Sequence, residues 1–458
     1  MQESWNPPVQ ITGSEDCLYL NIDRPRHHSK EPLPVLVWFH GGGWVAGSSQ
    51  DIDGRAIARY GLIVVTINYR LGALGFYASP ELDREARDGV SGNLALRDQQ
   101  AALGWIRRNI ATFGGDPQRV TIAGQSAGAL SNWIHLVSPG ADGLFSRMIA
   151  ESPVVSLFPN AGLDDARGVG GTRSLRDEEV RGASAQFAAR LDCATATSQL
   201  SCLRAKPAAD LIIALKPGVP GWGVGWGPVV DGKVLPAPVP ELIAAGRYRH
   251  APILTGGNWA ENTINSQRKT IFGQPLLTTQ DYERIVAALP HGTEILAHYP
   301  ASKFSSPEDA YNLMRGDARV CINIASAKVM ATNSPFYIYQ FDAPNGPPTI
   351  FEAKLPDTVP QHSFHTAEIP YIFGLGYPNE QHPGVPPLTP AQKQLSNRMM
   401  SDWAHFVRTG RPASPDWQAF DQSQSFEYLS PPRPRRVTAA ALGEHHNCDF
   451  WLRLLSGT

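Results

Sequence analysis

The chain has 458 residues, of which 42% are hydrophobic and 9% aromatic, and its formal net charge at pH 7 is −2. This composition excludes a disordered chain, and the small net charge without a basic stripe argues against binding to nucleic acid or to an anionic membrane surface. No apolar run approaches the roughly 18 residues that a transmembrane helix needs, and the first residues, MQESWNPPVQ, show neither the basic nor the apolar region expected of a signal peptide.

Alternating apolar and amphipathic stretches predict an α/β fold. Residues 34–40 and 62–68 are apolar on both sides and rich in β-branched side chains, which is typical of central strands in a parallel sheet. Residues 93–113 have apolar side chains at helical spacing and end at a glycine pair, and residues 119–123 form the next strand. This order of elements predicts a doubly wound α/β architecture.

The middle of the chain changes in composition. Residues 160–173 are rich in Gly, Asp and Arg, which predicts a mobile loop, and Ser174 with Asp177 then predicts a capped helix that runs to Leu191. No linker separates independent parts, so we expect one large domain over residues 1–458 with inserted helices. Further along, we expect helices over 279–289 and 392–407 and a solvated loop over 431–436.

The strongest chemical signal is GQSAG, residues 124–128. It follows a predicted strand and opens a predicted helix, which is the context of a nucleophile elbow. The two glycines permit a strained turn with close backbone packing, and the helix N-terminus stabilises negative charge that arrives there. The alternative is a Gly-rich β–α turn without chemistry, which this context disfavours. We therefore predict Ser126 as a nucleophile.

A second signal is HGGGW, residues 40–44, directly after another predicted strand. Acyl transfer creates an oxyanion, and backbone N–H groups reach that oxygen where no side chain intervenes. Consecutive glycines achieve this, as in the oxyanion loops of lipases and esterases. A flexible glycine turn is the alternative for this motif alone. The two motifs together, each after a strand, predict acyl-transfer chemistry.

A serine hydroxyl is a weak nucleophile near pH 7 and needs a histidine base oriented by an acid. In α/β-hydrolases these partners follow the serine in the order Asp or Glu, then His. Many histidines follow Ser126, and composition does not choose among them.

Seven segments carry a resemblance to a known family: SEDCLYLNI (14–22), HGGGW (40–44), TINYRLGALGF (66–76), GNLALRDQ (92–99), FGGDP (113–117), GQSAG (124–128) and CDFW (448–451). Together they resemble the type-B carboxylesterases, which include carboxylesterases, cholinesterases and fungal lipases. The resemblance spans nearly the whole chain. It implies an α/β-hydrolase fold, with a large and mostly parallel sheet covered by helices, and hydrolysis of small-molecule esters without a metal or an organic cofactor.

The resemblance also implies the partners of the serine. The family acid lies in a segment G-x-N-x-x-E-G, and its match GGNWAEN makes Glu261 the implied acid, although Ala260 and Asn262 depart from the pattern. The family histidine lies in H-G-x-E-I-x-Y-V-F, and its match HTAEIPYIF makes His365 the implied base. His362, three residues earlier, is the competing candidate.

Further roles follow from the same resemblance. The implied oxyanion donors are the backbone N–H groups of Gly42, Gly43 and Ala127. Ser152 resembles a position that supports the acid. Trp222 and Val224 stand where relatives have acyl-pocket side chains, with ordinary core packing as the alternative.

The five cysteines leave two hypotheses from composition: five thiols in a reducing compartment, or two disulfides and one free thiol in an oxidising one. The resemblance implies the pairs Cys193–Cys202 and Cys321–Cys448. It leaves Cys17 free, because its usual partner and the family's N-terminal strands would lie upstream. We therefore expect one wall of the substrate gorge to be open. The two implied disulfides predict a secreted or periplasmic location, with a cytoplasmic one as the alternative.

Two alternatives to a general carboxylesterase remain. The first is a specialised lipase, polyester hydrolase or hydrolase of a bulky natural ester. The second is a non-catalytic, cholinesterase-like adhesion domain, which the presence of all three triad matches disfavours. Choline esters are disfavoured as substrates because Gln125 stands where cholinesterases have Glu. The sequence indicates neither the physiological ester nor the oligomeric state.

Overall fold

The computed structural model describes residues 2–3, 10–26, 31–153, 175–215, 226–349, 355–374 and 386–456. Contacts between Cα atoms that are close in space divide the chain into two compact units. Unit 1 consists of Met1–Asp51, Ile63–Ile149 and Asp164–Arg249, and unit 2 of Ile52–Leu62, Ala150–Leu163 and His250–Thr458. The loop predicted over residues 160–173 lies outside the described residues. The expectation of one large domain stays a prediction.

The core of unit 1 is a group of strands in the order β6-β4-β5-β3: β3 (Leu20–Asp23), β4 (Leu33–Phe39), β5 (Ile63–Ile67) and β6 (Gly115–Gln125). β4 runs parallel to β5 and to β6, whereas β3 pairs antiparallel with β5. The side chains of β5 are all buried, and those of β4 are buried from its second residue on. Two-sided burial is expected of parallel strands, and it explains the continuous apolar runs of the sequence. A two-stranded ribbon, β1 (Gln2–Glu3) with β2 (Ile11–Thr12), precedes them.

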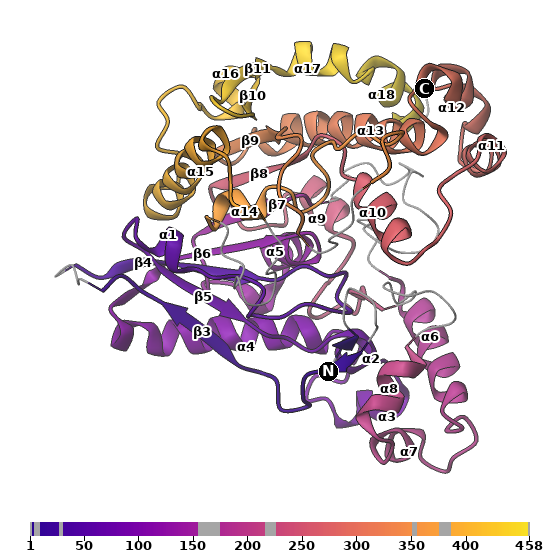
Figure 1. Ribbon diagram of the computed structural model, residues 1–458. Coiled ribbons are helices and arrows are strands. Elements are labelled where there is room, and N and C mark those ends of the chain that lie inside the picture. The colour runs from indigo at the N-terminus through magenta and orange to yellow at the C-terminus, as the bar shows by residue number, and fades with distance from the viewer. Residues whose placement is uncertain are drawn as a thin grey trace. The chain divides into compact units, whose positions relative to one another are not determined.

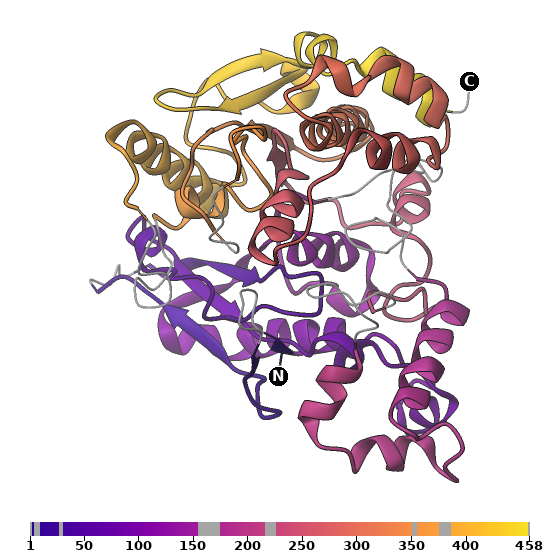
Figure 2. The ribbon, with the colours of Figure 1, turned by 45° about the vertical axis from the view of Figure 1, so that its right-hand side comes forward.

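The helices of unit 1 are α2 (Gly72–Phe76), α3 (Pro80–Glu85), α4 (Leu94–Asn109), α5 (Ala127–Val137), α6 (Asp177–Arg190), α7 (Gln199–Arg204), α8 (Ala208–Ala214) and α9 (Val239–Ala244). Figures 1 and 2 show α4 running along the strands of this unit. α4 continues as a 3-10 turn that ends at Gly114, where φ is +86°. A left-handed residue of this kind terminates a helix, as the glycine pair predicts.

Helix α6 begins later than the sequence suggested. It starts at Asp177, its N-cap is Arg176, and Glu179 accepts a hydrogen bond from the backbone N–H of Arg176 at 2.8 Å. The N-cap is therefore Arg176 and not Ser174, and the Glu179 carboxylate satisfies the backbone N–H of this N-cap. Ser174 itself lies outside the described residues.

The core of unit 2 contains β8 (Ile253–Asn258), β9 (Phe336–Phe341), β10 (Ser425–Leu429) and β11 (Arg435–Thr438). β8, β9 and β10 are parallel, and β11 is an antiparallel edge strand. With β7 (Arg147–Glu151), the described strands other than β1 and β2 belong to one nine-stranded sheet in the order β11-β10-β9-β8-β7-β6-β4-β5-β3. The expected large and mostly parallel sheet is confirmed.

The helices of unit 2 are α1 (Arg55–Ala58), α10 (Thr263–Ile271), α11 (Thr279–Ala287), α12 (Gly292–His298), α13 (Pro307–Met330), α14 (Ile369–Ile372), α15 (Pro390–Thr409), α16 (Phe420–Ser423), α17 (Ala439–His445) and α18 (Cys448–Ser456). α11 and α15 confirm the two helices predicted in this region, and both begin with a capping box. Among the described residues, no helix is long and apolar enough to cross a membrane.

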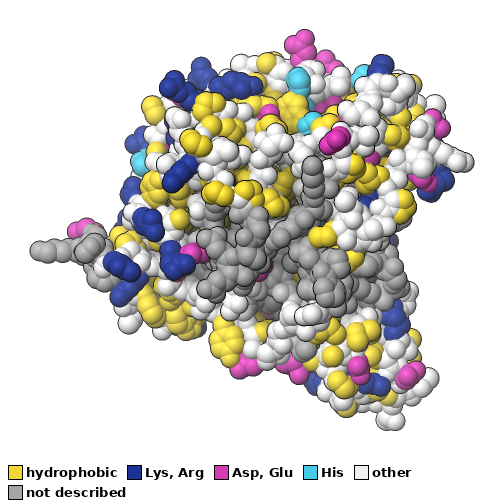
Figure 3. Space-filling model, viewed as in Figure 1, with side chains coloured by type: hydrophobic (Ala, Val, Ile, Leu, Met, Phe, Trp, Pro, Cys, Tyr) yellow, Lys and Arg dark blue, Asp and Glu magenta, His cyan; other side chains and the backbone are white. Residues whose placement is uncertain are grey.

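The basic run at residues 431–436 is only partly a loop. Its last two residues, Arg435 and Arg436, begin the edge strand β11, where Arg436 pairs with Glu427 of β10. Both arginines are exposed, and Figure 3 shows basic side chains gathered over the β10–β11 hairpin. Charged side chains on an edge strand also oppose pairing with another chain. Arg435 and Arg436 are therefore exposed to solvent, as expected, but they belong to a strand and not to a loop.

Two disulfides are present, and they join the pairs that the family resemblance implies. Cys193–Cys202 closes a separation of 9 residues in unit 1, and Cys321–Cys448 closes one of 127 residues in unit 2. On the chain-entropy model these closures contribute about 3 and about 5 kcal/mol of stability. The second bridge ties α18 to α13. Cys17 is a free cysteine and is partly exposed.

Thiol titration of the denatured, unreduced protein should count a single free thiol, and peptide mapping should locate it at Cys17. Oxidation of the other four cysteines follows from the two bridges. Five free thiols in protein isolated from its native compartment would contradict this pairing.

Candidate active site

Two sequence motifs meet at the carboxyl edge of β4 and β6. Phe39, the last residue of β4, pairs with Gly124 of β6. HGGGW therefore leaves β4 where Ser126 leaves β6. Ser126 is the N-cap of α5. Its φ of +57° and ψ of −121° lie outside the backbone regions that residues other than glycine normally adopt. A strained serine between a strand and a helix is the geometry that the GQSAG motif predicts.

The absence of side chains at two glycines makes this turn possible. A Cβ atom on Gly128 would lie 2.0 Å from the carbonyl oxygen of Phe39, and one on Gly124 would lie 2.7 Å from the same oxygen. Gly124 would also meet the backbone of Gly128 at 2.7 Å. The strand β4, the strand β6 and the helix α5 thus converge backbone to backbone.

The glycine loop after β4 passes close to Ser126. A Cβ atom on Gly41 would lie 3.2 Å from the Cβ of Ser126, so the loop approaches the serine at the distance of a direct contact. Gly42 and Gly43 have φ values of +99° and +60°, which explains glycine at both positions. Gly42 and Ala127 are buried, whereas Ser126 and Gly43 are partly exposed.

A chain of buried hydrogen bonds connects the glycine loop to helix α5. The indole N–H of Trp44 donates to Ser131 Oγ at 3.1 Å, and Ser131 Oγ donates to the carbonyl oxygen of Ala127 at 3.0 Å. Gln99 of α4 also donates to Ser131 at 3.2 Å and accepts from His135 Nε2 at 2.8 Å. Burial lowers the pKa of His135 to about 3, so its ring is neutral and donates from Nε2. This network holds the loop and the first turn of α5 together.

His40 anchors the start of the glycine loop. Its ring is buried, stacks on Tyr69 with a centroid distance of 4.2 Å, and lies 2.8 Å through Nδ1 from the carbonyl oxygen of Gly41. The Tyr69 hydroxyl donates to the backbone oxygen of His40 at 2.6 Å. Burial lowers the pKa of His40, so the neutral ring donates its Nδ1–H to Gly41. His40 therefore has a conformational role that its motif alone does not reveal.

In unit 2, Glu261 and His365 form a buried pair. His365 Nδ1 lies 2.5 Å from Glu261 Oε2, and the backbone N–H of Asn258 donates to Oε1 at 2.7 Å. The side chains of Glu261 and His365 are 2% and 10% exposed. Burial raises the pKa of Glu261, but the charge and hydrogen bond of His365, the charge of Arg319 and the Asn258 amide outweigh it. Together they hold the pKa below its usual range.

The contacts of the two competing histidines differ. His365 contacts Glu261 through its side chain, and its backbone N–H donates to the Glu261 carbonyl oxygen at 3.2 Å. The ring of His362 instead lies with Nε2 3.4 Å from Asp309 Oδ1. Of the two, His365 is therefore the one that an acid at position 261 orients.

A second carboxyl lies behind this pair. Glu368 is fully buried, accepts a hydrogen bond from Ser152 Oγ at 2.8 Å and accepts another from the side chain of Asn258 at 2.5 Å. Burial and the charge of Glu261 raise the pKa of Glu368 to about 7. Ser152, which the resemblance implies as a support of the acid, thus contacts Glu368, and Asn258 connects both of them to Glu261.

A third carboxyl, Glu151, completes this buried group. The indole N–H of Trp403 donates to Glu151 Oε1 at 2.7 Å, and Oε2 has no hydrogen-bond partner in the described part of the chain. Burial and the charge of Glu368 raise the pKa of Glu151 well above its usual range. Sequence reasoning did not identify Glu151, Glu368 or Asn258. Glu368 follows His365 by three residues within the family motif, which was the available signal.

The predicted site residues thus fall into two groups. Ser126, Ala127 and the glycines of HGGGW belong to unit 1, and Glu261, His365 and Ser152 belong to unit 2. Trp222 and Val224 lie outside the described residues. Among the described side chains, no group of three or more His, Cys, Asp or Glu residues is arranged to hold a metal ion.

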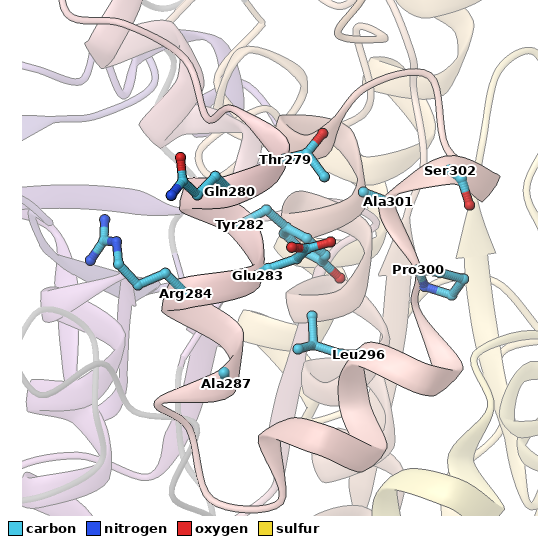
Figure 4. A pocket seen from close by; sticks show the side chains of 10 residues that line it. All are labelled: Thr279, Gln280, Tyr282, Glu283, Arg284, Ala287, Leu296, Pro300, Ala301 and Ser302. Carbon is cyan, nitrogen blue, oxygen red and sulfur yellow. The ribbon is translucent and has the colours of Figure 1, made fainter.

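Unit 2 also has cavities that contain neither Glu261 nor His365. Figure 4 shows one of about 530 Å³ beside α11, lined among others by Tyr282, Glu283 and Leu296. A second, of about 570 Å³, is lined by Trp259, Tyr299 and His362, among others. Volumes of this size suit small molecules, but neither lining includes Ser126, Glu261 or His365.

Comparison with known proteins identifies relatives along almost the whole chain. The Carboxylesterase family matches residues 1–451. Acylcarnitine hydrolase of Mus musculus is 33% identical over 96% of this chain and 75% of that protein. Carboxylesterase 5A of Felis catus is 32% identical over 97% of this chain and 79% of that protein. Fumonisin B1 esterase of Sphingopyxis macrogoltabida is 33% identical over 79% of this chain and 61% of that protein.

Gly128→Ala should lower the free energy of unfolding by on the order of 3 kcal/mol, because the new methyl group overlaps the Phe39 carbonyl. Gly182→Ala in α6 is the matched control, since its Cβ meets nothing within 4 Å. That change should stabilise the protein by about 0.5–1 kcal/mol. Urea denaturation measures both, and a Gly128→Ala protein as stable as wild type would contradict the backbone crossing.

Proposed function

The chain belongs to the carboxylesterase family and is a carboxylic-ester hydrolase, and we propose that it acts through a Ser126–His365–Glu261 triad. The observation that carries the proposal is the buried pair of Glu261 and His365, together with a strained serine at the carboxyl end of β6. In a triad of this kind the carboxylate contacts one imidazole nitrogen, and the other nitrogen acts as the base.

In the proposed reaction, Ser126 Oγ attacks the carbonyl carbon of the ester while its proton moves to His365 Nε2. Glu261 accepts the hydrogen bond of His365 Nδ1–H, which sets the tautomer and stabilises the imidazolium. The alcohol leaves with the proton from Nε2, and the acyl group stays on Ser126. Water then attacks the acyl-enzyme as His365 removes its proton, and the carboxylic acid is released.

The proposed oxyanion donors are the backbone N–H groups of Gly42, Gly43 and Ala127. The close approach of Gly41 to Ser126 and the position of Ala127 at the start of α5 support this assignment. The hydrogen bonds from Trp44 to Ser131 and from Ser131 to Ala127 support it further, because they hold the donors in place before substrate binds. Preorganised donors of this kind contribute much of the rate acceleration in acyl transfer.

Two finer parts of the proposal concern substrate and location. The substrate class is a small-molecule carboxylic ester, and the fumonisin esterase among the relatives makes a bulky natural ester the alternative to be tested. Hydrolysis rates for p-nitrophenyl esters of increasing acyl-chain length distinguish both of these substrate classes from the long-chain esters that a lipase prefers. The two disulfides support function in an oxidising compartment, where such bonds persist.

Ser126→Ala should lower kcat for p-nitrophenyl butyrate by on the order of 10⁶, because the nucleophile is lost while the fold remains. Ser302→Ala, an exposed serine, is the control and should match wild type. Ser126→Ala activity within tenfold of wild type would refute the nucleophile. A wild-type chain that hydrolyses no ester would favour the non-catalytic adhesion domain.

His365→Ala should be nearly as damaging as loss of Ser126, whereas His362→Ala should retain most of the activity. The reason is that only His365 contacts Glu261, while His362 faces Asp309. Steady-state kinetics of the two variants decide between the histidines. An inactive His362 variant beside an active His365 variant would reassign the base.

A further inference from the structure

Glu261 Oε2 has two nitrogen neighbours, one from His365 and one from the guanidinium of Arg319. Arg319 Nη1 lies 3.4 Å from this oxygen, and His365 Nδ1 lies 2.5 Å from it. The Arg319 side chain is 24% exposed, so most of it is sheltered from water. An acid that orients a catalytic histidine thus shares one oxygen between an imidazole and a guanidinium.

The position of Arg319 is built into the packing of α13. A Cβ atom on Gly316 would lie 2.8 Å from the carbonyl oxygen of Trp259, so this turn of α13 touches the backbone that follows β8. Arg319 is three residues further on and lies on the same helix face. Asn323, one turn later, is 3.6 Å from the Cβ position of Gly257. The face of α13 that carries Arg319 is therefore held over Glu261.

Two further buried carboxyls belong to the same cluster as Glu261, and neither has a cationic partner among the described residues. Glu368 and Glu151 are both fully buried, and their hydrogen-bond partners among the described residues, Ser152, Asn258 and Trp403, are uncharged. Within the described residues, no lysine or arginine forms an ion pair with Glu368 or Glu151. Arg319 thus supplies the positive charge that offsets a buried carboxylate at this position.

We propose that Arg319 is a positioning residue of the hydrolytic site, which keeps Glu261 ionised and lowers the basicity of His365. By sharing Oε2, the guanidinium withdraws part of the negative charge that would otherwise stabilise an imidazolium. A second positive charge near the ring also opposes protonation directly. The inference rests on the proposed triad and assigns it an additional, charge-tuning member.

The sign of the effect follows from the groups that face the pair. Glu261 and Glu368 favour the protonated ring, whereas Arg319 disfavours it. His362, three residues before His365, pairs with Asp309 of α13. Burial and the charges of the three carboxyls raise the pKa of the Tyr339 phenol, which stays neutral. Without Arg319 the carboxylates act unopposed. His365 then binds its proton more tightly and becomes an active base only at higher pH.

The test is the pH dependence of kcat/KM for p-nitrophenyl butyrate, followed at the isosbestic wavelength of the released phenol. Arg319→Met should move the acid limb upward by on the order of one pH unit. Arg319→Lys keeps a cation and should move it by less than half of that shift. Arg315→Met, one turn earlier on α13, is the control, because Arg315 faces Tyr311 and should leave the limb where wild type has it.

Several outcomes would overturn the inference. If the acid limb of the Arg319→Met pH profile coincides with that of wild type and only kcat is reduced, Arg319 has a purely structural role. A Lys variant that shifts fully, or an Arg315 control that shifts equally, would also contradict charge tuning. If Arg319→Met does not fold, Arg319→Gln serves with the same expectation. Failure of the triad is distinguishable, because wild-type turnover would then persist in Ser126→Ala.

Discussion

The carbonyl oxygen of Phe39 occupies the space that a side chain on Gly128 would need, at 2.0 Å from the Cβ position. This contact requires a backbone without side chains where β4, β6 and α5 converge. It brings the glycine loop after β4 beside the turn after β6, and it places Ser126 in a backbone conformation that few residues adopt. The approach of the loop to the serine follows from this one crossing.

Unit 2 contains a cluster of three buried carboxyls, Glu261, Glu368 and Glu151, and its contacts favour the charged form of Glu261 alone. Glu261 has a lowered pKa because His365, Arg319 and an amide favour its ionised form over the cost of burial. Glu368 and Glu151 lack cationic partners among the described residues, and their pKa values are raised. Neighbouring carboxyls with opposite shifts are typical of sites where protonation states matter for catalysis. The positive charge of Arg319 on α13 is one reason why Glu261 is the carboxyl that is ionised.

Local sequence patterns predicted the elements whose signals lie within a few residues. The strand–turn–helix context of GQSAG located the turn at Ser126, and the two-sided apolar runs predicted β4 and β5. The family resemblance singled out His365, although nothing local distinguishes it from His362, because their difference lies in contacts with Glu261 and Asp309. The predicted start of α6 was wrong, because the helix begins at Asp177 with Arg176 as its N-cap, and Glu179 accepts a hydrogen bond from the Arg176 N–H.

Tertiary packing determined what the sequence left open. Arg319 of α13 contacts Glu261, and Ser152 and Glu368 are connected to Glu261 through Asn258. No spacing in the chain predicts that Arg319 and Ser152 come close to this acid. The role of His40 was hidden for the same reason, because it depends on the ring of Tyr69 and on the carbonyl of Gly41. Such contacts follow from the approach of whole elements, as Gly316 shows for α13.

The central claim is that Ser126 is the nucleophile of an ester hydrolase. Covalent labelling tests it most directly, since an organophosphonate reacts much faster with an activated serine than with an ordinary hydroxyl. The native protein should be treated with a p-nitrophenyl phosphonate, digested and mapped by mass spectrometry. The proposal predicts one adduct, on the peptide that contains Ser126, with proportional loss of activity. An adduct on another residue that abolishes activity, or an active protein that never labels, would contradict it.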